Sequence, residues 1–453
     1  MAKKKNDLTL EEKLKNALVS EEEQPYPIPD NWVWTRLYFV STVITGKTPS
    51  KKNLEYYGTE IPFFKPGDLD VGRHVRVASE YLSKQGGALA KMIPAQSTAV
   101  CCIGTIGKSG FLEIPGATNQ QINSAISFFN PLCQYYYMNT DFFVNQLKGK
   151  SSSTTIPIVN KSKMEACYYP LPPIHEQQRI VERIESLFSK LDEAKEKIQM
   201  SLDSFENRKS AILYKAFSGE LTKKWREENG IKFKDWNKVE LRERCHINPK
   251  KISTKELNDN MDITFIPMAS VSDILGEVSE PLVKKLGKYK KGYTNFSEGD
   301  ILFAKITPCM ENGKIAVVKE LENNIGFGST EFHIVRCNNN TYNRFIYHLL
   351  RWKKFREEAK AVMSGAVGQQ RVPKSFLEEY KISFPSLEEQ KEIVHILDTI
   401  FDKEQDIQEL IDLIENIDLM KKSILARAFR GELGTNIPKE ESAIELLKSV
   451  LEV

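Results

Sequence analysis

Two runs of polar residues in the first half of the chain share side chains that suit hydrogen bonding. One run comprises Thr118, Asn119, Gln120 and Gln121, and the other includes Lys148, Lys150, Ser152 and Thr154. Asn and Gln can pair with the edge of adenine through two hydrogen bonds, whereas Lys and hydroxyl groups contact phosphates. We interpret both runs as candidate DNA contacts, and the alternative is a solvated loop ahead of a helix.

The second half carries a comparable set with different residue types. Its members are Ser329, Thr330, Ser364, Gln369, Gln370 and Arg371. Arg suits guanine as Gln suits adenine. Nine lysines are candidate phosphate contacts, each adding about one unit to the salt dependence of binding: Lys47, Lys51, Lys52, Lys250, Lys251, Lys284, Lys285, Lys290 and Lys291. Lys108, Lys305 and Lys314 are further candidate DNA contacts. The alternative for each lysine is solvated surface.

The sequence contains no complete phosphate-binding loop, zinc motif, dinucleotide-binding loop or adenine-methyltransferase segment. Gly107-Lys108-Ser109 ends like a phosphate-binding loop, but Cys102 stands where that motif needs its first glycine, so a turn between strands is expected. Cys245-His246 lacks a second ligand pair at zinc spacing. No glycine-rich dinucleotide loop follows a strand, and no Asn- or Asp-Pro-Pro-Tyr segment occurs. We therefore expect no catalytic residue, metal or cofactor in this chain, and we expect its seven cysteines to be reduced.

The elements that must position these residues occur twice. Residues 159–181 align with 372–394 at a constant offset, which places Glu389 and Gln390 on Glu176 and Gln177. Each copy leads into a segment without Gly or Pro, over 174–218 and 387–430, with apolar residues every three or four positions. This pattern predicts two long helices that each bury one narrow seam, most simply against each other. The seam includes Ile184, Leu191, Ile198, Ile400, Ile407 and Ile411.

Two regions with a different pattern of residues alternate with these predicted helices. Residues 25–168 and 231–381 hold short β-rich runs, glycine turns and a few helical stretches, which indicates two mixed α/β globules. They echo each other faintly, for example Gly107-Lys108 and Gly313-Lys314. The predicted order is a helical arm (1–24), a globule (25–168), a helical spacer (169–230), a globule (231–381), and a second spacer with a C-terminal helix (382–453). The predicted class is therefore α/β (α+β) with a pseudo-twofold repeat.

The net charge of +3 hides an uneven distribution. Residues 25–168 carry 14 Lys and Arg against 9 Asp and Glu, and residues 231–381 carry 26 against 19. Residues 382–453 carry 8 against 16. Two basic globules suit a polyanionic partner. No apolar run approaches the roughly 18 residues of a membrane helix, and the polar start does not resemble a signal peptide.

These features resemble the specificity (S) subunit of Type I restriction-modification systems over essentially the whole chain. The most specific motifs enter and leave the predicted helices: Pro170-Leu171-Pro172-Pro173-Ile174-His175-Glu176-Gln177-Gln178, and Ala216-Phe217-Ser218-Gly219-Glu220-Leu221 with its echo at Ala428-Phe429-Arg430-Gly431-Glu432-Leu433. The segments 117–122, 326–333 and 368–373 resemble that family's recognition domains. The second exit lacks the Leu-Thr-Lys-Lys-Trp-Arg tail of 221–226, which leaves the docking role of the last residues open.

The resemblance implies a non-catalytic, cytoplasmic subunit of a bacterial or archaeal complex. Each globule would read one half of a bipartite double-stranded DNA target. The two antiparallel helices would form a coiled-coil spacer that sets the gap and docks two methyltransferase (M) subunits, which methylate adenine at N6. Restriction and translocase (R) subunits would join for cleavage. S-adenosylmethionine would be used by the M subunits, and ATP and Mg by the R subunits.

Two other function classes remain open from the residues alone. One is a structural protein whose coiled coil links two protein-binding domains, for which salt-insensitive binding without DNA would be typical. The other is an enzyme with an unrecognised site, for which methyl transfer or DNA cleavage by the purified chain alone would be diagnostic. The target sequence and the gap between half-sites are not predicted.

Overall fold

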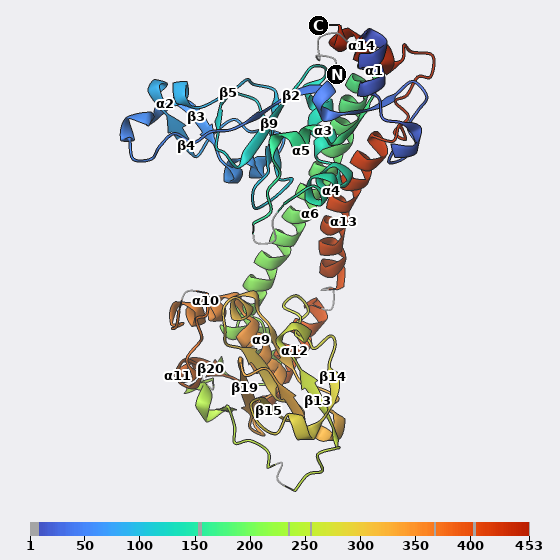
Figure 1. Cartoon of the computed structure of the whole chain (residues 1–453). Coiled ribbons are helices and arrows are strands. Elements are labelled where there is room, and N and C mark those ends of the chain that lie inside the picture. Colours follow the sequence, from blue (N-terminus) through green and yellow to red (C-terminus); the bar gives the residue numbers. More distant parts are fainter. Residues whose placement is uncertain are drawn as a thin grey trace. The chain divides into compact units, whose positions relative to one another are not determined.

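The computed structural model describes residues 9–152, 156–233, 236–253, 256–366, 368–401 and 405–452 (Figure 1). The chain divides into two compact units. The first unit combines residues 1–195 with 415–453, and the second comprises residues 196–414. Each unit therefore contains one globule together with parts of the long helices, because both boundaries fall inside helices.

The first globule is built from ten strands in three small sheets (Figure 1). The sheets have the orders β1-β10, β2-β9-β6-β7 and β4-β3-β8-β5. The strands are β1 (Val33–Arg36), β2 (Ser41–Thr45), β3 (Tyr57–Phe64), β4 (Glu80–Leu82), β5 (Met92–Ile93), β6 (Ser97–Cys101), β7 (Ser109–Leu112), β8 (Gly116–Thr118), β9 (Ile122–Ser127) and β10 (Tyr168–Leu171). Its helices are α2 (Lys84–Leu89), α3 (Pro131–Met138), α4 (Asp141–Gly149) and α5 (Lys161–Glu165).

The second globule repeats this topology strand for strand. Its sheets have the orders β11-β20, β12-β19-β16-β17 and β14-β13-β18-β15. The strands are β11 (Asn237–Glu240), β12 (Cys245–Ile247), β13 (Asp262–Ile266), β14 (Leu282–Lys285), β15 (Thr294–Phe296), β16 (Ile301–Ala304), β17 (Ile315–Val317), β18 (Gly326–Gly328), β19 (Phe332–Cys337) and β20 (Lys381–Phe384). Its helices are α8 (Cys309–Asn312), α9 (Asn343–Arg351), α10 (Lys353–Ala361) and α11 (Lys374–Glu379). The predicted pseudo-twofold repeat and mixed α/β class are confirmed.

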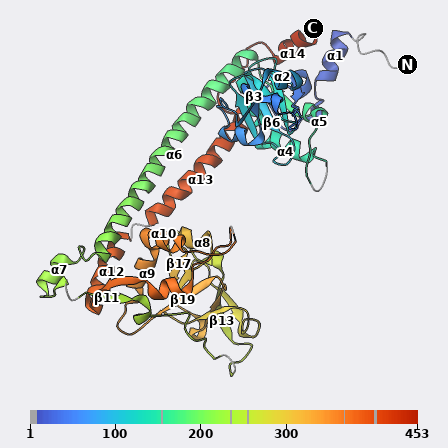
Figure 2. The same ribbon diagram turned by 90° about the vertical axis from the view of Figure 1, so that its left-hand side faces the viewer.

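The first predicted long helix is α6 (Ile174–Phe217), a single helix of 44 residues (Figure 2). In place of the second, the structure describes α12 (Leu387–Phe401) and α13 (Gln405–Ala428), with residues 402–404 outside the described part. Gly219 and Gly431 have φ of 78° and 74°, the left-handed conformation of a glycine that ends a helix. After α13, Glu432 N donates to Arg427 O and Gly431 N donates to Ala428 O, as in a Schellman ending. After α6, Gly219 N donates to Ala216 O in the same way, whereas the longer bond comes from Leu221 N to Lys215 O.

Within the first unit, α6 and α13 run antiparallel. Lys195 Nζ lies 2.9 Å from Asp418 Oδ1, and Lys421 pairs with Asp192. Residues later in one helix therefore meet residues earlier in the other. In the second unit the end of α6 meets α12, where Lys209 Nζ lies 5.1 Å from the centre of the Phe401 ring. The predicted antiparallel arrangement is confirmed within each unit.

Each globule is fastened to the start of a long helix by a buried carboxylate. Trp32 Nε1 donates to Glu176 Oε2 at 2.7 Å, and Trp236 Nε1 donates to Glu389 Oε2 at 2.8 Å. The next residue of each helix repeats as well: Gln177 Oε1 accepts from Asn130 N, and Gln390 Oε1 accepts from Tyr342 N. The repeated Glu-Gln of the sequence therefore fixes the globule on the helix.

The segment after one long helix completes the carboxylate site at the start of the other. In the second unit, Glu389 accepts from Thr222 and Arg226, which follow α6; Arg226 belongs to α7 (Lys223–Glu228). In the first unit, Glu176 accepts from Thr435 and Asn436, which follow α13. Although the second exit lacks the longer tail, Thr435 takes the place of Thr222 and Asn436 replaces the arginine.

The first and last helices of the chain pack on each other in the first unit. Helix α1 (Leu10–Ala17) packs on α14 (Ala443–Leu451), and Lys13 Nζ donates to Leu451 O at 2.7 Å. Ala17, Ala443 and Leu447 are buried in the same apolar cluster as the globule's α3 and the start of α6. In the parts of the chain that the structure describes, no helix is long and apolar enough to cross a membrane.

Candidate nucleic-acid interface

Three loop segments of the second globule are held together by backbone hydrogen bonds. Lys305 N, at the end of β16, donates to Glu331 O, and Val372 N donates to Lys305 O. Arg371 forms isolated bridges with Ile306 and Ser364. Residues 305–307, 329–332 and 364–372 meet here, apart from residue 367, which is outside the described residues, and we call them the second loop cluster. It gathers Lys305, Ser329, Thr330, Ser364, Gln369, Gln370 and Arg371, which are seven of the ten candidates of this half.

The first globule joins the equivalent segments in the same way. Cys102 N, just after β6, donates to Gln121 O, and Val159 N donates to Cys102 O. Ile158 bridges Ile103 and Ser152, as Arg371 bridges Ile306 and Ser364. The first loop cluster therefore comprises residues 102–105, 118–121 and 150–159, of which 153–155 are outside the described residues. The two candidate sets, which have unlike sequences, lie at equivalent places in the two globules.

A buried polar side chain ties each cluster to the sheet. His333 Nε2 lies 2.9 Å from Val372 O, and its Nδ1 lies 3.0 Å from Asn248 Nδ2. In the first globule Asn123 Nδ2 donates to Val159 O, and Asn123 Oδ1 accepts from Thr45 Oγ1. Burial lowers the pKa of His333, which is consistent with a neutral imidazole that donates at Nε2 and accepts at Nδ1. The same connections are made by different residue types.

Arg371 is held by a fork of two hydrogen bonds. Its Nε and Nη2 each donate to one oxygen of Glu331 at 2.9 Å, and its Nη1 donates to Gln369 O. Arg371 in turn lowers the pKa of Glu331. This pairing fixes the guanidinium at the surface, so a base that engages Arg371 must share it with Glu331 or displace that carboxylate. Glu331 was not among the candidates, although it follows Ser329 and Thr330 directly and occupies the place of Gln121.

The candidates of the first cluster differ in accessibility. Gln120 is exposed, and its Oε1 accepts a hydrogen bond from Thr48, a contact that the sequence analysis did not foresee. Asn119 is largely buried and exchanges hydrogen bonds with Gln121. Thr118 is fully buried in β8, where its backbone oxygen accepts from Lys47 N. Gln120 and Gln121 are therefore better placed for base contact than Thr118.

The lysine candidates divide into exposed and engaged groups. Lys47, Lys148, Lys250 and Lys251 are exposed, although Lys251 Nζ also donates to Tyr293 O at 3.3 Å. Lys150 is half-buried at the end of α4, and Ser152 is exposed in the loop beyond it. Lys108 and Lys314 occupy equivalent places in the two globules: Lys108 pairs with Asp70, whereas Lys314 Nζ donates to Met268 O and Val271 O. Each of these lysines follows a glycine with positive φ. Gly107 lies in the expected turn between β6 and β7, whereas in the second globule Gly313 ends the short helix α8.

Three predicted site residues have a different placement or no description. Thr154 lies outside the described residues, and the side chain of Ile407 does as well. Ile400 of the predicted seam is 37% exposed, and Phe401 is buried in its stead. The other seam residues are buried or half-buried, with Ile184 inside the core of the first unit.

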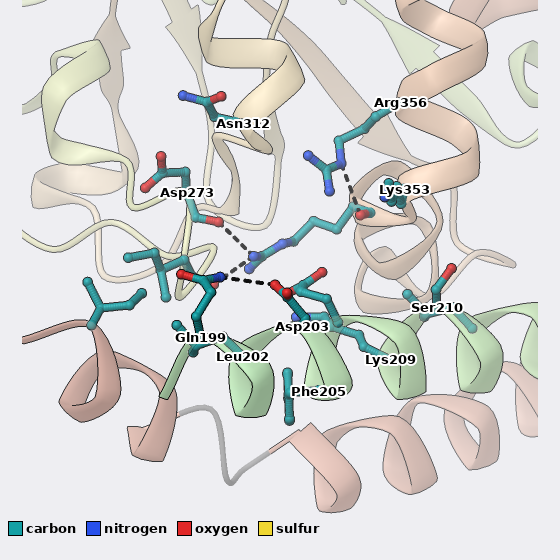
Figure 3. Close-up of a pocket in the computed structure, with 15 residues that line it drawn as sticks. Gln199, Leu202, Asp203, Phe205, Lys209, Ser210, Asp273, Asn312, Lys353 and Arg356 are labelled. Atoms are coloured by element: carbon teal, nitrogen blue, oxygen red, sulfur yellow. Dashed lines mark hydrogen bonds between the residues drawn. The ribbon is translucent and has the colours of Figure 1, made fainter. Parts of the chain in front are cut away.

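A cavity of about 410 Å³ lies between α6 and the second globule, within the second unit (Figure 3). Gln199, Asp203 and Lys209 of α6 line one wall, and Asp273, Asn312 and Arg356 line the other. Arg356 Nε donates to Arg351 O, and Arg351 Nη2 donates to Asp273 O. Small-molecule sites are mostly apolar with few polar groups, whereas charges of both signs line this cavity. No cluster of metal-ligating side chains occurs in the described ranges of the chain.

Comparison with known proteins gives a consistent result. The family model "Type I restriction modification DNA specificity domain" matches residues 29–202 and 233–416. The Type I restriction enzyme EcoEI specificity subunit of Escherichia coli is 33% identical over 258 residues, which are 48% of this chain but only 43% of that relative. The EcoAI specificity subunit of Escherichia coli is 34% identical over 49% of this chain and 45% of its own length. The alignments with these two relatives thus span less than half of their length.

Other similarities extend further at lower identity. The EcoKI specificity subunit of Escherichia coli strain K12 is 22% identical over 93% of this chain and 95% of its own. A solved chain from work on complex assembly and conformational transition of the type I R-M system has a TM-score of 0.66 and 20% identity, and covers 90% of this chain and 100% of its own. It shares the fold. With two matched regions that together span most of the sequence, the chain belongs to the family of Type I restriction-modification DNA specificity proteins.

Proposed function

We propose that this chain is the DNA sequence-specificity subunit of a Type I restriction-modification complex. Each globule reads one half of a bipartite double-stranded DNA target through its loop cluster. The observation that supports this most directly is the pair of clusters with identical backbone connections and unlike side chains. Two sites that share a frame and differ in donors and acceptors are suited to recognising two different base sequences.

The chain acts without catalysis of its own in this proposal. Two M subunits dock on the long helices and methylate adenine at N6 with S-adenosylmethionine, and R subunits supply ATP- and Mg-dependent cleavage. In this proposal, exposed apolar side chains of the long helices take part in docking the M subunits. They include Met200 and Tyr214 of α6 and Leu413, Leu419 and Met420 of α13.

Methylation mapping tests the proposal. The chain is co-expressed with the M subunit from its own operon in a host that lacks adenine methylation, and modified adenine is mapped across the DNA. A split motif with a fixed gap, lost when this chain is omitted, is the expected result. Methylation that persists unchanged without the chain contradicts the proposal and favours a coiled-coil linker between protein-binding domains.

A further inference from the structure

Two cysteines of the second globule lie face to face. Cys245 on β12 and Cys337 on β19 are directly opposed in an antiparallel pair, and their Sγ atoms are 3.5 Å apart. Strand β12 has three residues and forms the edge of its sheet. Neither sulfur plays a part in the proposed reading of DNA.

The strand hydrogen bonds show which kind of pair this is. Asn338 N donates to Arg244 O on one side, and Asn248 N donates to Ile334 O on the other. Because hydrogen-bonded and non-hydrogen-bonded pairs alternate along an antiparallel ladder, Cys245 and Cys337 form a non-hydrogen-bonded pair. In such pairs the Cα atoms are about 4.5 Å apart, within the range of about 4.4–6.8 Å that disulfides span. Rotation of the side chains can therefore bring the sulfurs into bonding distance without moving the backbone.

The two thiols differ in access. Cys337 is half-buried, so a small oxidant can reach it, whereas Cys245 is 2% exposed. The hydrogen bond with Cys337 and burial raise the pKa of Cys245. Other cysteines are less suited: Cys101 and Cys102 are adjacent in sequence, which directs their side chains to opposite faces, and both are buried.

We propose that Cys245 and Cys337 form a reversible disulfide with a low-molecular-weight disulfide as the oxidant. The Cys337 thiolate attacks one sulfur of the oxidant, which releases one small thiol and leaves a mixed disulfide on Cys337. Cys245 then loses its proton and attacks the Cys337 sulfur, which releases the second small thiol. The two protein thiols lose two protons and two electrons, and the one oxidant molecule takes them up to become two thiols.

The disulfide links the edge strand β12 covalently to β19, the strand that follows residues 329–332 of the second loop cluster. It joins residues 92 positions apart in the sequence, and closing so long a loop restricts the unfolded chain strongly. We expect oxidation to raise the Tm of the second unit by roughly 5–10 °C. The first globule has no equivalent pair among its strands, since Ser41 and Ser127 stand opposite at the corresponding place of β2 and β9, so its unfolding serves as an internal reference.

The test uses the full chain, oxidised glutathione and intact mass under native conditions. We expect wild-type protein to lose the mass of two hydrogens, to retain no glutathione, and to give a cross-linked peptide pair containing Cys245 and Cys337. Reduction should restore the original mass and Tm. Cys245→Ser should trap one glutathione on Cys337, whereas Cys309→Ser, which removes another half-buried thiol, should behave like wild type.

Three outcomes would overturn the proposal. They are wild-type protein whose mass does not change, wild-type protein that keeps glutathione on Cys337 without closing the bond, and a cross-link that involves another cysteine. If oxidation raised the Tm of Cys245→Ser protein as much as that of wild type, the disulfide would not be the cause of the stabilisation.

Discussion

At the scale of single residues, the two globules make equivalent contacts with different types of side chain. His333 and Asn123 occupy the same buried place, and each bonds to the backbone oxygen of a valine in the following loop. Arg371 and Ile158 likewise form equivalent backbone bridges, although one carries a guanidinium side chain and the other an alkyl side chain. The frame is therefore set by backbone geometry, and the side chains on it are free to differ.

Alanine substitutions in one loop cluster should affect one half-site alone. The triple variant Gln369→Ala, Gln370→Ala, Arg371→Ala removes donors from the second cluster, and we expect about 10- to 100-fold weaker binding, or about 1–3 kcal/mol for a lost bidentate pair. Methylation mapping should show a less strict sequence requirement in one half-site only. The matched control is Gln120→Ala with Gln121→Ala, which should relax the other half-site. Equal loss at both half-sites in either variant would contradict separate reading.

A second prediction concerns the buried ion pair of Arg226 and Glu389. Both side chains are almost fully buried, and Nη1 lies 2.5 Å from Oε1. Arg226→Met leaves the carboxylate with the neutral donors Thr222 and Trp236, so we expect about 3–5 kcal/mol lower stability of the second unit by urea unfolding. Adding Glu389→Gln to this variant should recover part of the loss because no buried charge remains. A double variant less stable than Arg226→Met would contradict this account.

At the scale of elements, the sequence repeat was sufficient to predict the long helices and little else of the geometry. The offset between Glu176 and Glu389, the apolar periodicity and the terminal glycines predicted where α6 begins and ends. The three-sheet topology was not predictable, because strands as short as β12 carry almost no periodic signal. The pairing of Arg371 with Glu331 was not predictable either, since it joins residues 40 positions apart in sequence through folding of the globule. The equivalence of Thr435 and Thr222 was visible only when both contacted a buried carboxylate.

We expect the buried histidines to make the stability of the second unit dependent on pH. Burial lowers the pKa of His333 and of His348, whose Nε2 lies 2.9 Å from Asp398 Oδ1. Because the folded pKa lies below the ordinary value of 6.5, the unfolded chain binds more protons below that pH. Stability should therefore be fully present above about pH 6.5 and should fall as the pH is lowered from there toward the folded pKa.

Thermal unfolding between pH 8 and pH 5 measures this effect. His333→Asn introduces the residue of the first globule and keeps a donor and an acceptor; combined with His348→Gln, it should flatten the profile. His246→Gln, which changes an exposed histidine on β12, should leave the profile as in wild type. A profile unchanged by the double substitution would assign the pH dependence to other groups.

At the scale of the whole molecule, α6 is the continuous element that carries the chain from the first unit into the second. The register of its pairing with α13 is known from the ion pairs Asp192–Lys421 and Lys195–Asp418. Extending that register places residue 199 opposite residue 414. A length change must be made in both helices at matched positions, because a change in one alone would break the register of the other.

Lengthening both helices should alter the gap between half-sites and leave the half-sites unchanged. Seven residues inserted after Gln199 and seven after Ile414 add about 10 Å of helix and rotate its surface only slightly, since 3.6 residues make one turn. At 3.4 Å per base pair, we expect methylation mapping to report the same two half-sites with a gap longer by about three base pairs. The control is a seven-residue insertion in α6 alone, which should lose methylation. An unchanged gap in the double insertion would mean that the helices do not set the spacing, and altered half-sites would mean that the loop clusters do not act independently of it.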